Sequence, residues 1–315
     1  TLGGAIYAAS LTTNASGTTA INTTTITTTN SQTYNDAVTL GATTTLTGTN
    51  INLASTVESP STAYGLTVNG SGTTTFGGVV GGNSHPLLSI TTDSAGTTAI
   101  NTTAITTTGS QTYNDAVTLG ATTTLTATSG DISFGSTLDG AYTLSSIASG
   151  ATSFADTIGS IPLAGLTITT TTLTAHAIVL ASNGDISITN GGAGSIGNGI
   201  AGTGVKLTKA GAGTLTLSGT NTYSGDTTIS AGTLTLTGSL SSSTGLVMTG
   251  SSILDLQTTQ TVASLSMTTG NSITRSSGTS SLTVSGTSVL GGAITTSGTQ
   301  TYTGAVTLGS DITLT

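Results

Sequence analysis

The chain has 315 residues, and only 4% of them are charged: 3 Lys and Arg stand against 11 Asp and Glu, for a formal net charge of −8. Three basic residues cannot neutralise a phosphate backbone, which excludes nucleic-acid binding and disfavours an anionic membrane surface. The absence of Cys excludes disulfides and thiolate metal sites, the scarcity of Glu, Lys and Arg disfavours helices, and no apolar run is long enough for membrane insertion.

A long repeat fills the first half of the chain. Residues 17–47 read GTTAINTTTITTTNSQTYNDAVTLGATTTLT and recur at 96–126 with two changes, which defines a 79-residue period. We assign supra-repeats to 11–89 and 90–165, and a partial copy to 291–315. The 79-residue unit divides into roughly four 19- or 20-residue segments, so we expect four turns of chain in each unit.

From 166 to 204 the pattern loosens into strand-like runs and a Gly-rich passage at 191–204. A phosphate loop would need Gly-Lys-Ser/Thr at the start of a helix, but Lys206 is followed by Leu207. We therefore interpret the passage as a wide turn, and we expect Lys206 and Lys209 to border a turn of the chain.

The clearest short repeat lies within 205–290, where Gly-Thr-Leu-Thr-Leu occurs at 213–217 and again at 232–236, a 19-residue period. Alternation of Leu and Thr is the period-two pattern of a strand with one buried face. A segment of this length without a helix can coil once and return beside its start, which predicts an all-β, right-handed parallel β-helix with turns of about 19 or 20 residues. Leu215 should stack inward on Leu234, and Leu217 on Leu236.

We expect one continuous β-solenoid over 1–315, with about sixteen turns, excerpted from a longer array. A string of immunoglobulin-like sandwiches is the alternative for the 79-residue period. It is disfavoured because the 19-residue sub-period is visible and no Trp is present.

The run from 207 to 234 carries Lys-x-Gly-x-Gly-Thr-Leu-x-Leu, then Asn-x-Tyr-x-Gly, then Thr-x-Ile-x-x-Gly-x-Leu. It resembles the autotransporter-associated β-strand repeat of bacterial passenger domains, and the 79-residue units resemble repeats of giant filamentous-haemagglutinin-type adhesins. The resemblance implies a parallel β-helix, export to the extracellular space or outer surface of a bacterium, and an adhesive or structural role.

Residues that could carry chemistry are scattered. Asp36 and Asp115 are equivalent in the two supra-repeats, so four turns would place them about 19 Å apart, too far for a glycosidase pair. Asp131, Asp185 and Asp226 each follow a Gly, which indicates turns. We expect no metal at the isolated His85 and His176, and we predict no catalytic, cofactor-binding or metal-binding residue.

Two repeated residue types invite binding hypotheses. A Tyr recurs in one context, and we interpret it as a corner residue whose hydroxyl reaches solvent or backbone, in preference to a sugar-stacking platform; its positions are Tyr34, Tyr113, Tyr223 and Tyr302. Uninterrupted Thr runs such as 23–25 place Thr on both faces of a strand, which weighs against an ice-binding surface.

The sequence therefore predicts a non-catalytic stalk or spacer of a bacterial cell-surface adhesin or extracellular filament. Its possible partners are surface or matrix glycans and further copies of the chain, end to end or side by side. The alternatives are an ice-binding solenoid and a carbohydrate-active β-helix enzyme. An uncapped solenoid exposes strand edges, so we expect either more 79-residue units or stacked chains at the ends.

Overall fold

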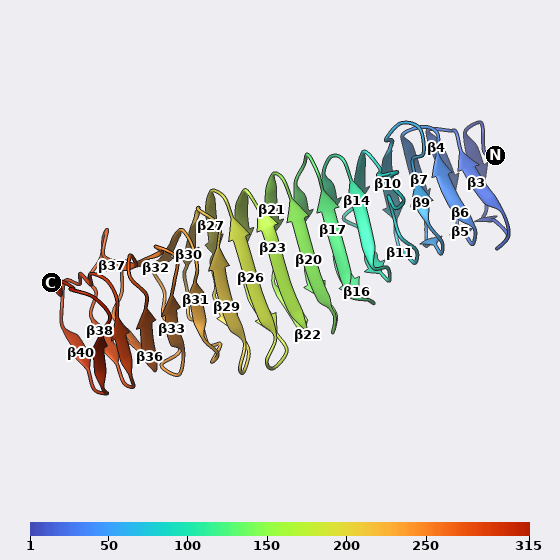
Figure 1. Cartoon of the computed structure of the whole chain (residues 1–315). Helices are drawn as coiled ribbons and strands as arrows, with labels where there is room; N and C mark the ends of the chain where they lie inside the picture. The colour runs from blue at the N-terminus through green and yellow to red at the C-terminus, as the bar shows by residue number, and fades with distance from the viewer. The chain divides into compact units, whose positions relative to one another are not determined.

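The computed structural model describes residues 1–315 as 41 β-strands without a helix (Figure 1). No helix is present that is long and apolar enough to cross a lipid bilayer. The strands form two compact units, Thr1–Pro162 and Leu163–Thr315. Each unit is a parallel β-solenoid, and together they contain about 15 turns.

Strand formation follows the period-two pattern. In the strand Thr214–Leu217 the two Leu side chains are buried and the two Thr side chains face outward, and Thr233–Leu236 repeats this arrangement. β-Branched Thr suits an extended backbone, and Gly and Asn provide the turns between strands. Four positive-φ residues other than Gly occur, two of them Asn83 and Ser84 in one loop.

The first unit has three parallel faces, with one strand of each face in a typical turn. Face 1 contains β1 (Ile6–Ala8), β4 (Thr25–Thr28), β7 (Thr44–Gly48), β10 (Gly65–Gly70), β12 (Ser89–Thr92), β15 (Gln111–Tyr113), β18 (Ile132–Phe134) and β21 (Ala151–Phe154). Face 2 contains β2 (Leu11–Thr12), β5 (Gln32–Tyr34), β8 (Ile51–Leu53), β11 (Thr73–Phe76), β13 (Thr97–Ile100), β16 (Ala116–Leu119), β19 (Leu138–Asp139) and β22 (Ile158–Leu163). Face 3 contains β3 (Thr18–Ile21), β6 (Ala37–Leu40), β9 (Val57–Glu58), the single bridge residue Val80, β14 (Ala104–Thr107), β17 (Thr123–Ala127) and β20 (Thr143–Ala148).

The second unit is built in the same way. One sheet contains β23 (Gly165–Thr170), β26 (Asp185–Asn190), β29 (Lys206–Ala210), β31 (Thr227–Ile229), β33 (Gly245–Met248), β36 (Ser264–Met267), β39 (Ser288–Leu290) and β41 (Val306–Leu308). A second contains β24 (Thr172–Ala175), β27 (Ala193–Ile196), β30 (Thr214–Leu217), β32 (Thr233–Leu236), β34 (Ile253–Leu256) and β37 (Ser272–Thr274). The third side holds β25 (Ile178–Leu180) with β28 (Ile200–Ala201), and β35 (Gln260–Val262), β38 (Leu282–Val284) and β40 (Gln300–Tyr302). Neighbouring strands such as β26 and β29 run side by side in the same direction in Figure 1.

The predicted 19-residue register is confirmed. Leu215 pairs with Leu234 and Leu217 with Leu236, and all four side chains are fully buried. Other turns are longer: Leu66 pairs with Ile90, 24 positions along the chain, because the loop after Val80 projects from that turn. The longer turns explain why about 15 turns form instead of the expected sixteen.

The 79-residue repeat does not correspond to four turns. Each strand of the first copy lies on a different face from its counterpart in the second copy. β3 lies on face 3 and its counterpart β13 on face 2. Likewise β4 on face 1 corresponds to β14 on face 3, and β5 on face 2 corresponds to β15 on face 1. With Val80 counted as a strand, the shift is eleven strand positions, or three and two-thirds turns. Near-identical segments therefore occupy faces rotated by a third of a turn.

This exchange of faces is possible because every face makes the same demand on the chain. Ile26 in β4 and Ile105 in β14 are both fully buried, although they lie on different faces. Each strand needs only alternating inward residues and free backbone groups for its parallel neighbours. The short sub-period led to the expectation of four turns, which is wrong because the turns within this unit are longer on average than the sub-period.

The inward Leu columns should dominate stability. We expect Leu234→Ala to lower the free energy of unfolding by about 2–5 kcal/mol, because it removes a buried side chain between two stacked neighbours. The outward-facing Thr216→Ala, in the neighbouring strand, should change it by less than about 0.5 kcal/mol. Urea unfolding followed by circular dichroism measures both, and equal effects of the two substitutions would contradict this assignment of inward and outward positions.

Candidate functional site

Three of the four repeated Tyr residues lie in the core and not at a solvent-facing corner, and Tyr302 is half-buried. Tyr34, Tyr113 and Tyr223 are fully buried, and burial raises their pKa values. Their hydroxyl groups were expected to reach solvent or backbone, but they bond side chains. Tyr34 donates to Gln32 Oε1 at 2.8 Å and Tyr113 to Gln111 Oε1 at 3.0 Å, while Tyr223 bonds the hydroxyl of Thr227. A buried ring cannot act as a sugar-stacking platform.

The Gln two residues before Tyr34 and Tyr113 makes further hydrogen bonds, and we call this Gln–Tyr pair with its backbone partners a hub. Gln32 Nε2 donates to the carbonyl oxygens of Ile26 at 3.2 Å and Thr47 at 2.8 Å, so one side chain joins three strands. Gln111 makes the equivalent bonds in the second supra-repeat. Sequence reasoning missed the Gln residues, although the tripeptide Gln-Thr-Tyr in all three copies was the signal that identifies them.

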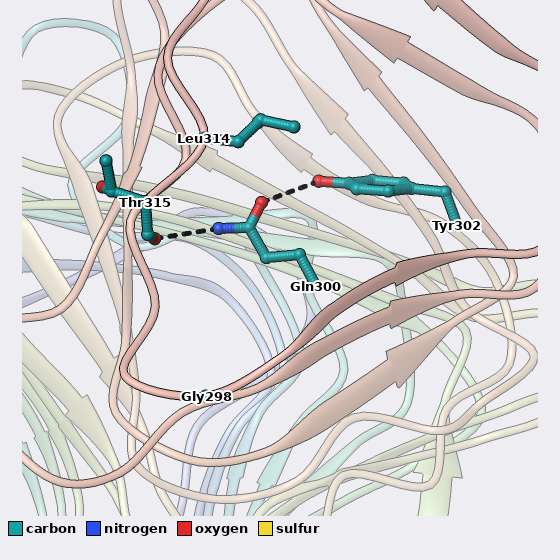
Figure 2. A pocket seen from close by; sticks show the side chains of 5 residues that line it. All are labelled: Gly298, Gln300, Tyr302, Leu314 and Thr315. Atoms are coloured by element: carbon teal, nitrogen blue, oxygen red, sulfur yellow. Dashed lines mark hydrogen bonds between the residues drawn. The ribbon is translucent and has the colours of Figure 1, made fainter.

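A hollow of about 360 Å³ surrounds the third copy of this hub. Figure 2 shows Gln300 between Tyr302 and Thr315; it accepts a hydrogen bond from the Tyr302 hydroxyl at 3.2 Å and donates to the Thr315 carbonyl at 3.0 Å. In the other copies Tyr34 pairs with Leu53, and Tyr113 stacks on Phe134 with ring centroids 5.2 Å apart. The hollow is thus a repeat position of the core and not a distinct ligand site.

Two buried carboxylates are held by Thr hydroxyl groups. Asp36 accepts hydrogen bonds from the hydroxyl groups of Thr13 at 2.5 Å and of Thr19 at 2.9 and 3.0 Å. In the second supra-repeat, Asp115 accepts from Thr92 at 2.7 Å and from Thr98 at 2.8 and 2.9 Å. Asp36 precedes a strand of face 3 and Asp115 one of face 2, so the two do not lie on one line as expected. Each carboxylate lies at a corner of its own turn and bonds Thr hydroxyl groups of the preceding turn.

The pKa values of the two carboxyl groups shift in opposite directions, although both groups have the same kind of hydrogen-bond partners. Burial acts to raise the pKa of Asp36, but the hydroxyl groups of Thr13 and Thr19 outweigh it and lower that pKa. For Asp115 burial is stronger than the bonds from Thr92 and Thr98, and its pKa is raised, with the nearby Asp93 carboxylate adding to the effect.

These directions predict different pH dependence for a matched pair of variants. Asp36 stabilises the fold above its unfolded-state pKa and loses this contribution as the pH falls, whereas the contribution of Asp115 declines as the pH rises through its raised pKa. At pH 7, Asp36→Asn should therefore lower the urea midpoint more than Asp115→Asn, and the difference should shrink below about pH 4. An equal loss for both variants at pH 7 would argue against the two environments described.

Lys209 does not border a turn as expected but lies inside one. Its side chain is fully buried, and Nζ donates to the carbonyl oxygens of Ala210 at 2.7 Å, Gly211 at 2.9 Å and Ala231 at 3.3 Å. Burial lowers the pKa of Lys209 to about 8. The ammonium group therefore joins the backbones of two consecutive turns in the second unit, and Lys206 beside it remains exposed.

Lys209 should give the protein a rise in stability at alkaline pH. Its folded-state pKa lies below that of an unfolded Lys, so between pH 8 and about 10 the unfolded chain binds more protons and stability increases with pH. We expect the urea midpoint to rise from pH 7.5 to 9.5 in the unmodified protein. The rise should vanish in Lys209→Met and persist in Lys206→Met; its persistence in Lys209→Met would assign it to another group.

The two His residues have partners that sequence spacing did not reveal. His85 Nδ1 lies 3.3 Å from Glu58 Oε2, whose Oε1 accepts from Asn83 at 2.8 Å, so a carboxylate is close to His85 after all. His176 Nε2 lies 2.6 Å from Asn198 Nδ2. No group of three or more His, Asp or Glu lies close enough to hold a metal ion. Asp131 accepts from the backbone of Ala151 at 2.7 Å, a turn role.

A continuous row of hydroxyl groups follows the outer side of face 1. Register pairing aligns one Thr or Ser from each of seven strands, and two of them, Ser133 and Ser153, are bonded at 3.0 Å. The row comprises Thr25, Thr45, Thr67, Thr91, Thr112, Ser133 and Ser153. The adjacent row keeps Thr only at Thr27 and Thr47 and continues with Asn69. Uninterrupted Thr runs thus yield an ordered outer row, because alternate Thr side chains are turned inward.

The stretch around Lys209, Tyr223 and the paired Leu strands can now be compared with known families. Residues 207–245 match the Passenger-associated-transport-repeat. This passenger repeat begins in β29 and ends at the start of β33. It contains Lys209 with its three carbonyl partners, both copies of Gly-Thr-Leu-Thr-Leu and Tyr223. Neither curated proteins nor solved structures gave a match to the chain. The passenger repeat confirms the resemblance to autotransporter passengers, implies a secreted or surface-exposed bacterial protein, and suggests a structural role.

Proposed function

We propose that the chain is a stalk or spacer of a bacterial cell-surface adhesin or extracellular filament. The observation that carries this proposal is the repetition of one structural unit on successive faces, combined with the passenger repeat at 207–245. Stacked turns extend a surface by a constant step, and a repeated surface favours multivalent contact.

The side chains support a carbohydrate-active enzyme or an ice-binding solenoid less well than they support a spacer. A carbohydrate-active enzyme of this fold needs carboxylates gathered at one place, and Asp36 and Asp115 are instead bound to Thr pairs on different faces. An ice-binding surface needs several aligned rows of Thr, and face 1 supplies one full row beside one that changes to Asn69. A spacer requires only that the turns stack, and every buried polar hub serves that stacking.

A spacer should tolerate removal of one supra-repeat. We expect deletion of residues 17–95 to leave a folded protein, because segment 96–126 then follows Ser16 in place of the near-identical 17–47. Three and two-thirds turns at about 4.8 Å per turn should shorten the protein by about 18 Å. Small-angle scattering of the purified protein measures the change, and a surface-displayed form should lose reach but not surface attachment.

Deletion of residues 17–87, which breaks the repeat register, is the matched control and should lower the urea midpoint. A collapsed or unfolded deletion 17–95 would contradict interchangeable faces. Polysaccharide cleavage that one Asp→Ala substitution abolishes would overturn the structural function itself.

A further inference from the structure

A furrow crosses consecutive turns at the end of the face 1 strands in the first unit. It consists of two adjoining hollows of about 440 and 310 Å³ that share Thr29. The first is lined by Tyr7, Ala8, Ala9 and Thr27, and the second by Thr28, Thr47, Gly48, Thr49, Asn69, Ser71 and Asp93. Register pairing of Tyr7 with Thr27, Thr27 with Thr47 and Thr47 with Asn69 aligns its floor, and the Asp93 backbone bonds that of Val68 one turn further.

The furrow presents polar groups that the chain itself does not use. The side chains of Thr47, Asn69 and Ser71 make no hydrogen bond within the protein. Asp93 accepts from the backbone of Gly70 through Oδ1 at 3.2 Å, which leaves Oδ2 free. Tyr7 is the most exposed large hydrophobic side chain of the protein, at 77%. Hydroxyl, amide and carboxylate groups thus follow an exposed aromatic ring along one line.

The furrow is not a repeat feature, unlike the Gln–Tyr pairs and the Asp–Thr groups described above. In the second supra-repeat Thr126 corresponds to Thr47, and its register partner is Ile147 where Thr47 has Asn69. Ala127 stands at the position of Gly48. Ile147 is 39% exposed and offers no hydrogen-bonding group. The convergence of Tyr7, Asn69 and Asp93 is therefore specific to one place.

Charge and strand pairing narrow the ligand class. The first unit, residues 1–162, contains no Lys or Arg, and the furrow carries the negative Asp93, so an anionic ligand is disfavoured. A peptide strand adds along a free sheet edge, whereas the furrow runs across β4, β7 and β10, which are paired on both sides; of the furrow strands only β1 is paired on one side. A neutral ligand rich in hydroxyl groups, with apolar ring faces for Tyr7, fits the remaining groups.

We propose that this furrow binds a neutral glycan chain laid across the turns, with Tyr7 against a sugar ring and with Asn69 and Asp93 hydrogen-bonded to its hydroxyl groups. From Tyr7 to Asp93 the floor spans four inter-strand steps, about 19 Å, so the ligand is an oligosaccharide and not a single sugar. This inference rests on the proposed function and adds to the spacer a glycan-binding site of its own.

The test is binding of the full chain to an immobilised panel of neutral glucans, mannans, galactans and xylans, with heparin and dextran sulfate as the anionic arm. We expect binding to at least one neutral glycan and none to the anionic polymers. Isothermal titration with the corresponding oligosaccharide should show affinity reduced about tenfold or more in Tyr7→Ala and in Asn69→Ile, which copies the second supra-repeat. Asp93→Asn should reduce it as well.

Tyr142→Ala, a substitution of another exposed Tyr outside the furrow, and Thr126→Ala should leave affinity unchanged, and unchanged urea midpoints should confirm that all variants fold. Absence of binding to every neutral glycan, preferential binding to the anionic polymers, or equal loss in Tyr142→Ala would overturn the furrow site. None of these outcomes alters the length change on deletion of residues 17–95, so failure of this inference is distinguishable from failure of the spacer function.

Discussion

In-register stacking of parallel strands is the constraint on which the rest of the structure depends. Strands within each sheet bond a strand of the preceding turn and one of the following turn, so inward positions form columns along the unit. Leu215, Leu234 and Leu254 form one such column, and Tyr113, Phe134 and Phe154 another, with ring centroids about 5 Å apart. A column of like side chains fills space at a constant interval, so a chain with only 3% aromatic residues can still form a filled core.

Corners place a second demand on the chain, because strand ends leave backbone groups that the ladders do not pair. The protein meets this demand with a few buried polar side chains, each contacting more than one turn. Gln32 binds carbonyl oxygens of two other strands, Asp36 binds Thr hydroxyl groups from separate segments, and Lys209 binds three carbonyl oxygens. Chemistry that would indicate catalysis in another protein thus serves to satisfy buried groups here.

Sequence reasoning recovered what period and spacing encode. The fold class and the inward stacking of Leu215 on Leu234 follow from alternation and a 19-residue repeat. The face that each supra-repeat segment occupies could not be predicted. It depends on the number of strand positions between the two copies, and one of these positions is the single bridge residue Val80, which has no strand pattern in the sequence. The burial of Lys209 and the contact of Glu58 with His85 were also missed, since both depend on loop paths that bring together residues far apart in the sequence. The furrow required the register of four strands before Tyr7 and Asn69 could be placed on one line.

The rotation between supra-repeats has a consequence for how the protein meets its surroundings. If the repeat were a whole number of turns, every copy of a given residue would lie on the same face and point in the same direction. A repeat of three and two-thirds turns instead points successive copies a third of a turn apart, so three of them would face three directions. Recombination between the near-identical segments would change the number of copies and turn everything beyond by the same step. Growth by this unit therefore gives the copies of a repeated residue no common direction, whereas a feature present once, such as the Tyr7 furrow, lies on one side of the first unit.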